Sequence, residues 1–404
     1  MKQILIALTL IPHLAFGLMI SSKSSGRGWT AMAQPQDTLS GAYNPSGLAF
    51  IGDRWDLGAL YMRPDGTMTI SGNEDFNGTF SSHKDKNFFL PEFGINKDVC
   101  ECYMTFGLIG YNRNFAKTTY SSPIDIYGTS KLGLEYVQET LAPVLTIRFG
   151  GCHAIGVSVD FIFQRLKVNG LENFANPFFS EEPNRVTNKG YDSSYGITGT
   201  VGWTSIFDNW VFVGLAYQPE VKMTRFAKYK GLLPNKGEMN LPQRMMGGVA
   251  VRPIPCLTIE FDVEYVKWND TKVFNNRLDL NFFDLPAFGT EDGVGLGWRN
   301  QAHFRFGIEY MPMDDLILRI GYSQARTPIK SSGTFQGALT ANVVEEYITM
   351  GLTYHWDFCY EISTFYAYGF EQKVNGSIPV ILGGGDISLK GSSMLAGISI
   401  GRKF

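Results

Sequence analysis

One spacing near the end of the chain could support nucleophilic catalysis. Gly397, Ser399 and Gly401 match the G-x-S-x-G pattern that surrounds the nucleophilic serine of many hydrolases. That serine needs a helix directly after it and a histidine further along the chain. Only the sequence Arg-Lys-Phe follows, so this serine cannot be a nucleophile of that type.

A second pair with catalytic chemistry is His303 with Ser323, which fall in two adjacent predicted strands. A phospholipase built on a barrel would need these side chains to face its lipid substrate. They share strand parity with Arg305 and Arg319, so they belong to the charged inner face. We therefore predict that the protein is not an enzyme and that it has no catalytic residues and no cofactor.

Most of the chain shows the alternation of apolar and polar residues that is typical of β-strands. In residues 257–268 Leu, Ile, Phe, Val and Tyr alternate with Thr, Glu, Asp and Glu, and the pattern recurs along the chain from Trp55 to Phe404. The predicted strands are 55–72, 87–95, 101–112, 132–150, 153–168, 191–206, 209–223, 240–253, 256–268, 298–312, 315–326, 343–356, 359–371 and 391–404. An even number of strands, each with one greasy and one charged face, is typical of bacterial outer-membrane barrels.

We therefore predict an all-β fold, a 14-stranded antiparallel transmembrane β-barrel. The tight turns, among them 96–98, fall at one end and the long loops at the other, as in outer-membrane barrels. A secreted β-sandwich would also alternate, but it would not need the aromatic residues, such as Trp268 and Trp356, near strand ends. Phe404 then ends the strand that closes the barrel.

Composition and the start of the chain agree with export. Of the 404 residues 18% are charged, and the net charge of −3 gives no basic excess, so we predict no nucleic-acid partner. Residues 1–17 contain a lysine, a short apolar stretch and a small-x-small site, and are predicted to be a cleaved signal peptide. No later segment supplies a spanning helix, so the mature chain must cross a membrane by its strands.

The cysteines are odd in number. The chain has Cys100, Cys102, Cys152, Cys256 and Cys359, none with the spacing of a zinc site, so we predict no metal. In an exported protein at least one thiol then lacks an intrachain partner. All fall at or beside predicted periplasmic turns, which suggests disulfides between neighbouring turns or to other envelope proteins. Scattered small hydrophobic residues are the alternative interpretation.

A Ser- and Gly-rich segment, residues 18–50, precedes the predicted barrel of residues 51–404. It ends with the turn signature Asn44, Pro45, Ser46 and Gly47. With the signal peptide before it and the strand pattern ending in Phe after it, this order resembles the FadL-type outer-membrane transporters of long-chain fatty acids and aromatic hydrocarbons. The block from Trp298 to Pro328 adds to the resemblance. This family usually has Ala at the position of Ser46.

The resemblance implies that residues 18–50 form a hatch inside the barrel and that the ligand is a fatty acid or similar hydrophobic molecule. Outer-membrane lipids and lipopolysaccharide would surround the barrel. A general diffusion porin for small polar solutes is the alternative function, and an adhesin or structural envelope protein is a third. The external stretch ENFANPFF suggests an apolar capture loop that contains Phe174, Phe178 and Phe179.

Family members also bend their third strand to open a lateral gap, and they bind the ligand carboxylate with cations. Gly107 and Gly110 are the candidates for the bend, although packing against the hatch would also need small residues there. The stretches FQRLKVNG and KWNDTKVFNNR correspond to the family's cation positions. They imply four candidate carboxylate anchors: Arg165, Lys167, Lys272 and Arg277.

Overall fold

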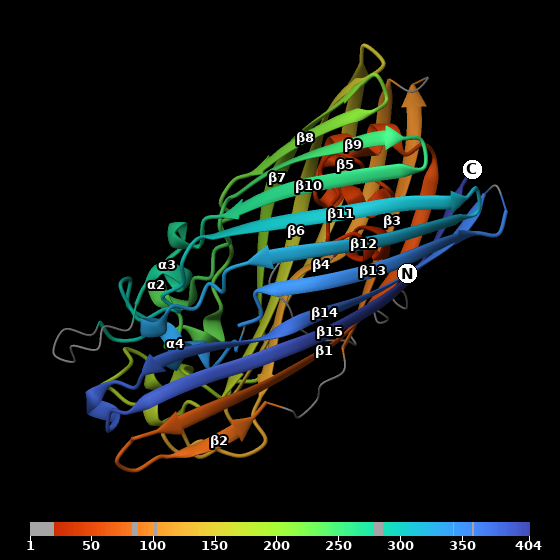
Figure 1. Cartoon of the computed structure of the whole chain (residues 1–404). Helices are drawn as coiled ribbons and strands as arrows, with labels where there is room; N and C mark the ends of the chain where they lie inside the picture. Colours follow the sequence, from red (N-terminus) through yellow and green to blue (C-terminus); the bar gives the residue numbers. More distant parts are fainter. Residues whose placement is uncertain (1–19, 83–87, 101–102, 278–285, 342, 358) are drawn as a thin grey trace, which may run out of the picture.

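Fourteen antiparallel strands form one closed barrel in the computed structural model, as predicted (Figure 1). The structure describes residues 20–82, 88–100, 103–277, 286–341, 343–357 and 359–404. The barrel strands are β1 (Arg54–Ser71), β3 (Phe88–Cys100), β4 (Met104–Thr119), β5 (Gly133–Phe149), β6 (His153–Asn169), β7 (Asp192–Phe207), β8 (Val211–Gln218), β9 (Arg244–Ile254), β10 (Leu257–Val266), β11 (Gln301–Met313), β12 (Leu316–Ala325), β13 (Glu346–His355), β14 (Tyr360–Ser377) and β15 (Asp386–Lys403). A further short strand, β2 (Gly78–Ser81), pairs with the outer part of β1. The predicted signal peptide lies outside the described residues.

Alternation of side chains gives the barrel its two faces. On β10, Glu260, Asp262 and Glu264 are buried inside, whereas Phe261 and Tyr265 are exposed on the outside. Each strand therefore presents apolar side chains to lipid and polar ones to the interior. The sequence period of two residues is the physical origin of this arrangement, because successive side chains point to opposite faces of a strand.

The carboxyl end closes the barrel. β15 pairs with β1 from Asp386 opposite Ser71 to Lys403 opposite Arg54. The backbone N–H of Phe404 donates a hydrogen bond to the carbonyl of Asp53 at 3.1 Å, and the ring of Phe404 is exposed. The terminal aromatic residue thus ends the closing strand, as the sequence indicates.

The two ends of the barrel differ, as predicted. Tight turns and the carboxyl terminus lie at one end, and the long loops with their short helices lie at the other (Figure 1). Two details of the prediction are wrong. Residues 96–98 belong to β3 rather than to a turn, and Trp268 is buried in the interior, where it packs against Phe274 and Trp298 instead of lying in an interfacial girdle.

Short helices organise the long loops. They are η3 (Glu172–Phe174), η4 (Pro183–Arg185), η5 (Ala227–Tyr229), α2 (Pro234–Gly237), η6 (Trp268–Asp270), α3 (Lys272–Asn275), η8 (Ser331–Gly333), α4 (Thr334–Gly337) and η9 (Val380–Leu382). None of the helices in the described ranges has the length and apolar character that crossing a bilayer requires.

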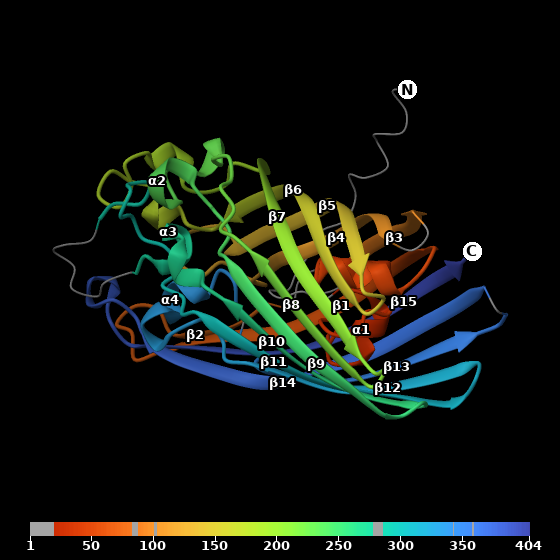
Figure 2. The same ribbon diagram turned by 90° about the horizontal axis from the view of Figure 1, so that it is seen from above.

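The segment before β1 folds inside the barrel. It contains α1 (Ser22–Gly26), η1 (Thr38–Ala42) and η2 (Pro45–Phe50), and nearly all of its described residues are buried. Figure 2 shows these elements enclosed by the strands, in the half of the barrel nearer the carboxyl terminus. We call residues 20–50 the hatch.

Candidate functional site

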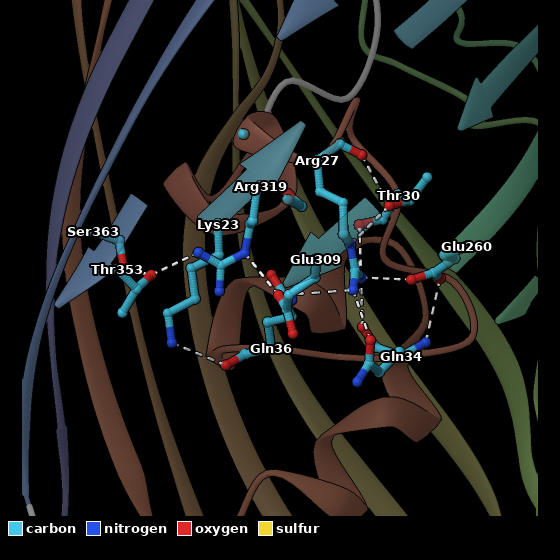
Figure 3. A network of polar contacts seen from close by, with 12 residues as sticks. Lys23, Arg27, Thr30, Gln34, Gln36, Glu260, Glu309, Arg319, Thr353 and Ser363 are labelled. Carbon is cyan, nitrogen blue, oxygen red and sulfur yellow. Dashed lines mark hydrogen bonds and ion pairs between the residues drawn. The ribbon is translucent and has the colours of Figure 1, made fainter. Parts of the chain in front are cut away.

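Buried charges of the barrel wall hold the hatch (Figure 3). Arg27 pairs with Glu260 of β10 at 2.5 Å, and both side chains are fully buried. Glu309 of β11 lies 3.9 Å from Arg27 and pairs with Arg319 of β12 at 2.8 Å. Lys23 pairs with Glu361 of β14. The charged inner face predicted from the sequence is therefore a set of partners for the hatch and for itself, because an unpaired charge at this depth would be costly.

The predicted turn motif of the hatch contacts the opposite wall. Asn44 caps η2 and donates hydrogen bonds from Nδ2 to the carbonyl of Met32 at 2.9 Å and to Oγ1 of Thr204, on β7, at 2.9 Å. Pro45 is the first residue of η2, and Ser46 hydrogen-bonds Thr204 at 2.7 Å. The hydroxyl of Ser46 thus adds a polar contact between the hatch and the wall.

Two wall glycines make room for this motif. A Cβ on Gly202 would lie 2.1 Å from Oδ1 of Asn44, and one on Gly156 would lie 2.4 Å from the backbone nitrogen of Ser46. Gly47 packs against the ring of Pro35. The motif therefore touches β6 and β7 so closely that a side chain on either wall position would displace it.

An apolar cavity of about 380 Å³ lies among the long loops. Leu166 and Val168, on the inner face at the outer end of β6, form part of its wall. Apolar and aromatic residues of six loops also line it: Tyr127, Leu171, Phe174, Phe178, Phe179, Leu232, Leu233, Pro234, Met239, Val273, Pro286, Ala287, Phe288, Val294, Leu296, Phe335, Leu339, Pro379, Ile381 and Leu382. A cavity of this size and composition is suited to a small hydrophobic molecule.

Aromatic packing shapes the cavity. Phe174 is at the centre: its ring centroid lies 5.1 Å from that of Phe179, 6.0 Å from Phe288 and 6.2 Å from Phe335. Phe178 stacks edge-on against Phe179 at 4.9 Å and is largely exposed. The structure thus places all three phenylalanines of the predicted capture loop on the cavity wall, with Phe178 at its mouth.

Polar contacts at the back of the loops fix this shape. Tyr127 donates a hydrogen bond to the carbonyl of Phe335 at 2.7 Å. The carboxylate of Glu172 accepts hydrogen bonds from Ser130 and Asn188. Partial burial alone would raise the pKa of Glu172, but these hydrogen bonds hold that pKa below its ordinary value. The ionised carboxylate of Glu172 therefore holds neighbouring loop segments together and is not available to bind a ligand.

The described backbone pairing between β3 and β4 stops partway along β4, and we call the unpaired stretch the gap. Their described pairing ends at Phe93 opposite Gly110, and β4 continues past this point to Thr119. Pro91 lies two residues before Phe93 in β3 and has no N–H to donate. Its carbonyl accepts a hydrogen bond from the side chain of Asn112, from Nδ2, at 3.0 Å. The two strands therefore separate at this level.

The two predicted bend residues have different surroundings. Gly110 is in the last β3–β4 pair, and a Cβ there would lie 2.2 Å from the ring of Phe93. Gly107 faces the hatch, and a Cβ there would lie 2.6 Å from Leu48. The alternative interpretation, packing against the hatch, therefore describes Gly107, whereas Gly110 lies where the strands part.

A smaller cavity of about 100 Å³ lies deeper in the barrel, beside the gap. Its lining is mixed. Trp29 of the hatch with Met62 and Pro64 of β1 supply apolar surface, and the polar and charged lining residues include Asp65, Lys117, Gln301, His303, Arg305, Ser323 and Glu345. One cluster of buried apolar residues includes Trp29, Leu60, Met62, Leu90 and Phe115 near this level and also the aromatic residues of the outer cavity. Apolar surface thus extends from the loops to the gap.

Two of the four predicted carboxylate anchors point away from the cavity. Arg165 and Lys167 alternate with the cavity residue Leu166 on β6 and therefore face outward. Arg165 lies 5.1 Å from the ring centroid of Tyr191, and Lys167 pairs with Glu135 at 2.9 Å.

The other two predicted anchors also lie off the cavity wall. Lys272 adjoins Val273 but pairs with Glu291, and that hydrogen bond raises the pKa of Lys272. Arg277 is exposed. Burial lowers the pKa of Lys330, and the charges of Arg277 and Arg299 lower it further. These cations belong to the outer rim.

The sequence prediction missed most of the cavity. Residues 286–298, PAFGTEDGVGLGW, are long, external and unusually apolar, which was a usable signal for Phe288 and Leu296. Phe335 and Leu339, in the loop after β12, carried the same signal. Pro91 inside a strand was a signal for the gap, because proline is confined to edges and bulges of sheets.

Three cysteines have described side chains, and none forms a disulfide. Cys152 and Cys256 are partly exposed and Cys359 is exposed, all at tight turns of the end that carries the carboxyl terminus. Cys102 and the side chain of Cys100 lie outside the described set. Within the described ranges, no group of three or more His, Cys, Asp or Glu residues could hold a metal ion.

A plugged fourteen-stranded barrel with an apolar cavity in its outer loops is an outer-membrane transport protein. The chain matches the family described as outer membrane protein transport protein (OMPP1/FadL/TodX) over residues 14–404, and it belongs to that family. The predicted resemblance and the predicted absence of enzymatic function agree with this membership.

Solved structures confirm the fold. A Pseudomonas aeruginosa FadL homologue matches with a TM-score of 0.71 and 14% identity over 98% of this chain and 100% of its own. The toluene transporter TodX of P. putida matches with a TM-score of 0.70 and 15% identity over 95% of this chain and 98% of its own. The monoaromatic hydrocarbon channel CymD has a TM-score of 0.62 and 14% identity over 96% and 99%. No curated protein sequence matches the chain significantly.

Proposed function

We propose that the protein takes up hydrophobic small molecules, of the kind represented by long-chain fatty acids and monoaromatic hydrocarbons, across the outer membrane. The observation that carries this proposal is the apolar cavity of about 380 Å³ among the external loops of a plugged barrel. Similar solved structures, described as a toluene transporter and a monoaromatic hydrocarbon channel, support the same class of ligand.

Filling the cavity tests the proposal. Leu339 lies on the cavity wall, and the variant Leu339→Trp would occupy much of its space. Saturable binding of propylbenzene to purified protein, and its uptake by cells, should fall sharply. Met313→Trp, on the exposed outer surface of β11, is the matched control and should behave like the wild type. Equal uptake by both variants would contradict a transport role for the cavity.

The proposed route leads from the outer cavity to the inner one and leaves through the gap between β3 and β4. The apolar cluster that includes Phe174, Trp29 and Met62 supports this order. Lateral exit suits an apolar molecule because it reaches the bilayer without crossing the polar periplasmic half of the lumen. In this proposal residues 18–50 act as a plug, and residues 51–404 form the transport barrel after removal of the signal peptide, residues 1–17.

A general diffusion porin remains the alternative function, and the hatch argues against it. Arg27, Asn44 and their neighbours connect opposite walls of the barrel and would obstruct a polar pathway. Liposome swelling with sugars separates the two functions. A plugged transporter should give almost no swelling, whereas a porin should give rates that scale with the size of the sugar.

The outward-facing Arg165 and Lys167 suit a different partner. They lie at the outer end of β6, where the phosphates of lipopolysaccharide would meet the barrel. We propose that they contact those phosphates, because cations form charge-assisted hydrogen bonds with phosphate oxygens.

A further inference from the structure

One amide group is isolated in the outer cavity. Gln336, in α4, is 9% exposed and lines the cavity between Phe335 and Leu339. Neither its Oε1 nor its Nε2 has a hydrogen-bond partner among the described residues. A buried amide normally has such partners, because leaving it unpaired is costly. Gln336 therefore presents a free donor and a free acceptor to whatever occupies the cavity.

Among the described residues, the rest of the cavity wall offers no charge. Its other polar side chain, the hydroxyl of Tyr127, already donates to the carbonyl of Phe335 at 2.7 Å. No Lys, Arg or His is among the residues that line the cavity in the described part of the chain. The nearby Lys272 is directed to Glu291. An ionised carboxylate in this cavity would therefore have no cation, and burying it unpaired is unfavourable.

The approach to the cavity is acidic. A groove of about 330 Å³ adjoins the cavity and shares Phe174, Phe179 and Ile381 with it. Glu74 and Asp75 line the far side of this groove. Their charges would repel an anionic ligand and would leave a neutral one unaffected, which favours neutral molecules before the cavity is reached.

We infer that the cavity selects neutral, largely apolar molecules that carry one hydrogen-bonding group, such as a phenol, alcohol, ketone or ester, and that Gln336 binds this group. The amide can accept from a hydroxyl or donate to a carbonyl, which covers these classes. The inference rests on the proposed function and narrows its substrate class. In this inference the ligand is a neutral molecule bound by the amide of Gln336, and not a carboxylate bound by cations.

The test uses three ligands that share a propylbenzene body and differ in the group opposite the propyl chain: 4-propylphenol, propylbenzene and 4-propylbenzoate. Their dissociation constants are measured by equilibrium dialysis against the full-length protein in nanodiscs, with empty nanodiscs as the blank. In the wild type, 4-propylphenol should bind about tenfold more tightly than propylbenzene, the gain of about one net hydrogen bond, and 4-propylbenzoate most weakly. This comparison requires no variant.

The variant Gln336→Leu should abolish the preference for 4-propylphenol while propylbenzene binds as tightly as before or more tightly. Gln324→Leu, an exposed glutamine of β12, is the matched control and should keep the wild-type order. Preferred binding of 4-propylbenzoate by the wild type, or an unchanged phenol preference in Gln336→Leu, would overturn the inference and leave the transport proposal standing. Absence of saturable propylbenzene binding to the wild type would overturn both.

Discussion

Arg27 of the hatch and Glu260 of β10 form an ion pair of 2.5 Å between Nη2 and Oε2, with both side chains fully buried. Glu260 also accepts hydrogen bonds from the backbone N–H groups of Ala33 at 2.9 Å and Gln34 at 3.2 Å. One wall carboxylate thus binds the hatch at three residues. An apolar cluster that includes Met32 and Leu48 also packs the hatch against the wall. The buried charges add to this packing, and Arg27 is the partner whose loss leaves a wall carboxylate unpaired.

Breaking that pair should loosen the hatch. Arg27→Met leaves Glu260 buried without its cation, which typically costs about 3–5 kcal/mol. We expect faster liposome swelling with sugars and a lower thermal unfolding temperature than in the wild type. Arg27→Met combined with Glu260→Gln should recover part of the loss, because the unpaired charge is then removed.

An exposed ion pair supplies the control for this experiment. Lys97 pairs with Asp53 at the surface, and such pairs contribute only about 0–1 kcal/mol. Lys97→Met should therefore match the wild type in both assays. If Arg27→Met and Lys97→Met behave alike, the hatch is held by something other than its buried charges.

The sequence predicts the barrel well because every strand obeys the same local rule. Side chains that alternate between lipid and lumen leave a period of two residues, and Phe404 marks where that pattern closes on β1. The rule fails at Trp268, because an aromatic residue at a strand end can turn inward as readily as outward. That choice depends on neighbours such as Phe274 and Trp298, which the local pattern does not specify.

The candidate site was less predictable because it joins loops that are distant in sequence. The stretch with Phe174 was identifiable, since several apolar residues in one external loop are unusual. Its contacts with Phe288 and Phe335 depend on loop packing, which no periodicity encodes. The direction of the predicted anchors depended on register: Arg165 is adjacent to Leu166, and a shift of one residue reverses the face of a strand.

The rim cations provide a test of how the ligand is bound. If Arg165 and Lys272 anchored a carboxylate, replacing both with Gln would weaken binding of a long-chain fatty acid far more than of a neutral hydrocarbon of equal length. Because Arg165 faces outward and Lys272 pairs with Glu291, we expect both affinities to stay within about twofold of the wild type. Competition binding with both ligands measures this, and a selective loss of the fatty acid would restore the anchor hypothesis.

The thiols predict crosslinks in the cell envelope. Cys152, Cys256 and Cys359 lie at separate tight turns on one end of the barrel and do not pair with one another. We expect non-reducing gels of intact cells to show species of higher mass or shifted mobility that disappear on reduction. Cys359→Ser, at the exposed position, should remove part of that signal, whereas a single unshifted band in the wild type would contradict crosslinking.

The last prediction separates the two glycines of β4. Substituting Val at both Gly107 and Gly110 should slow uptake, but their surroundings assign different causes. Gly110→Val places a Cβ against the ring of Phe93 at the point where β3 and β4 separate, so it should slow uptake of a hydrophobic ligand without changing sugar permeability. Gly107→Val overpacks the hatch at Leu48, typically at a cost of about 1–3 kcal/mol, so it should increase sugar permeability. Ligand uptake and liposome swelling, measured on both single variants, check this; the same response from both would show that the position of Gly110 at the gap has no special role.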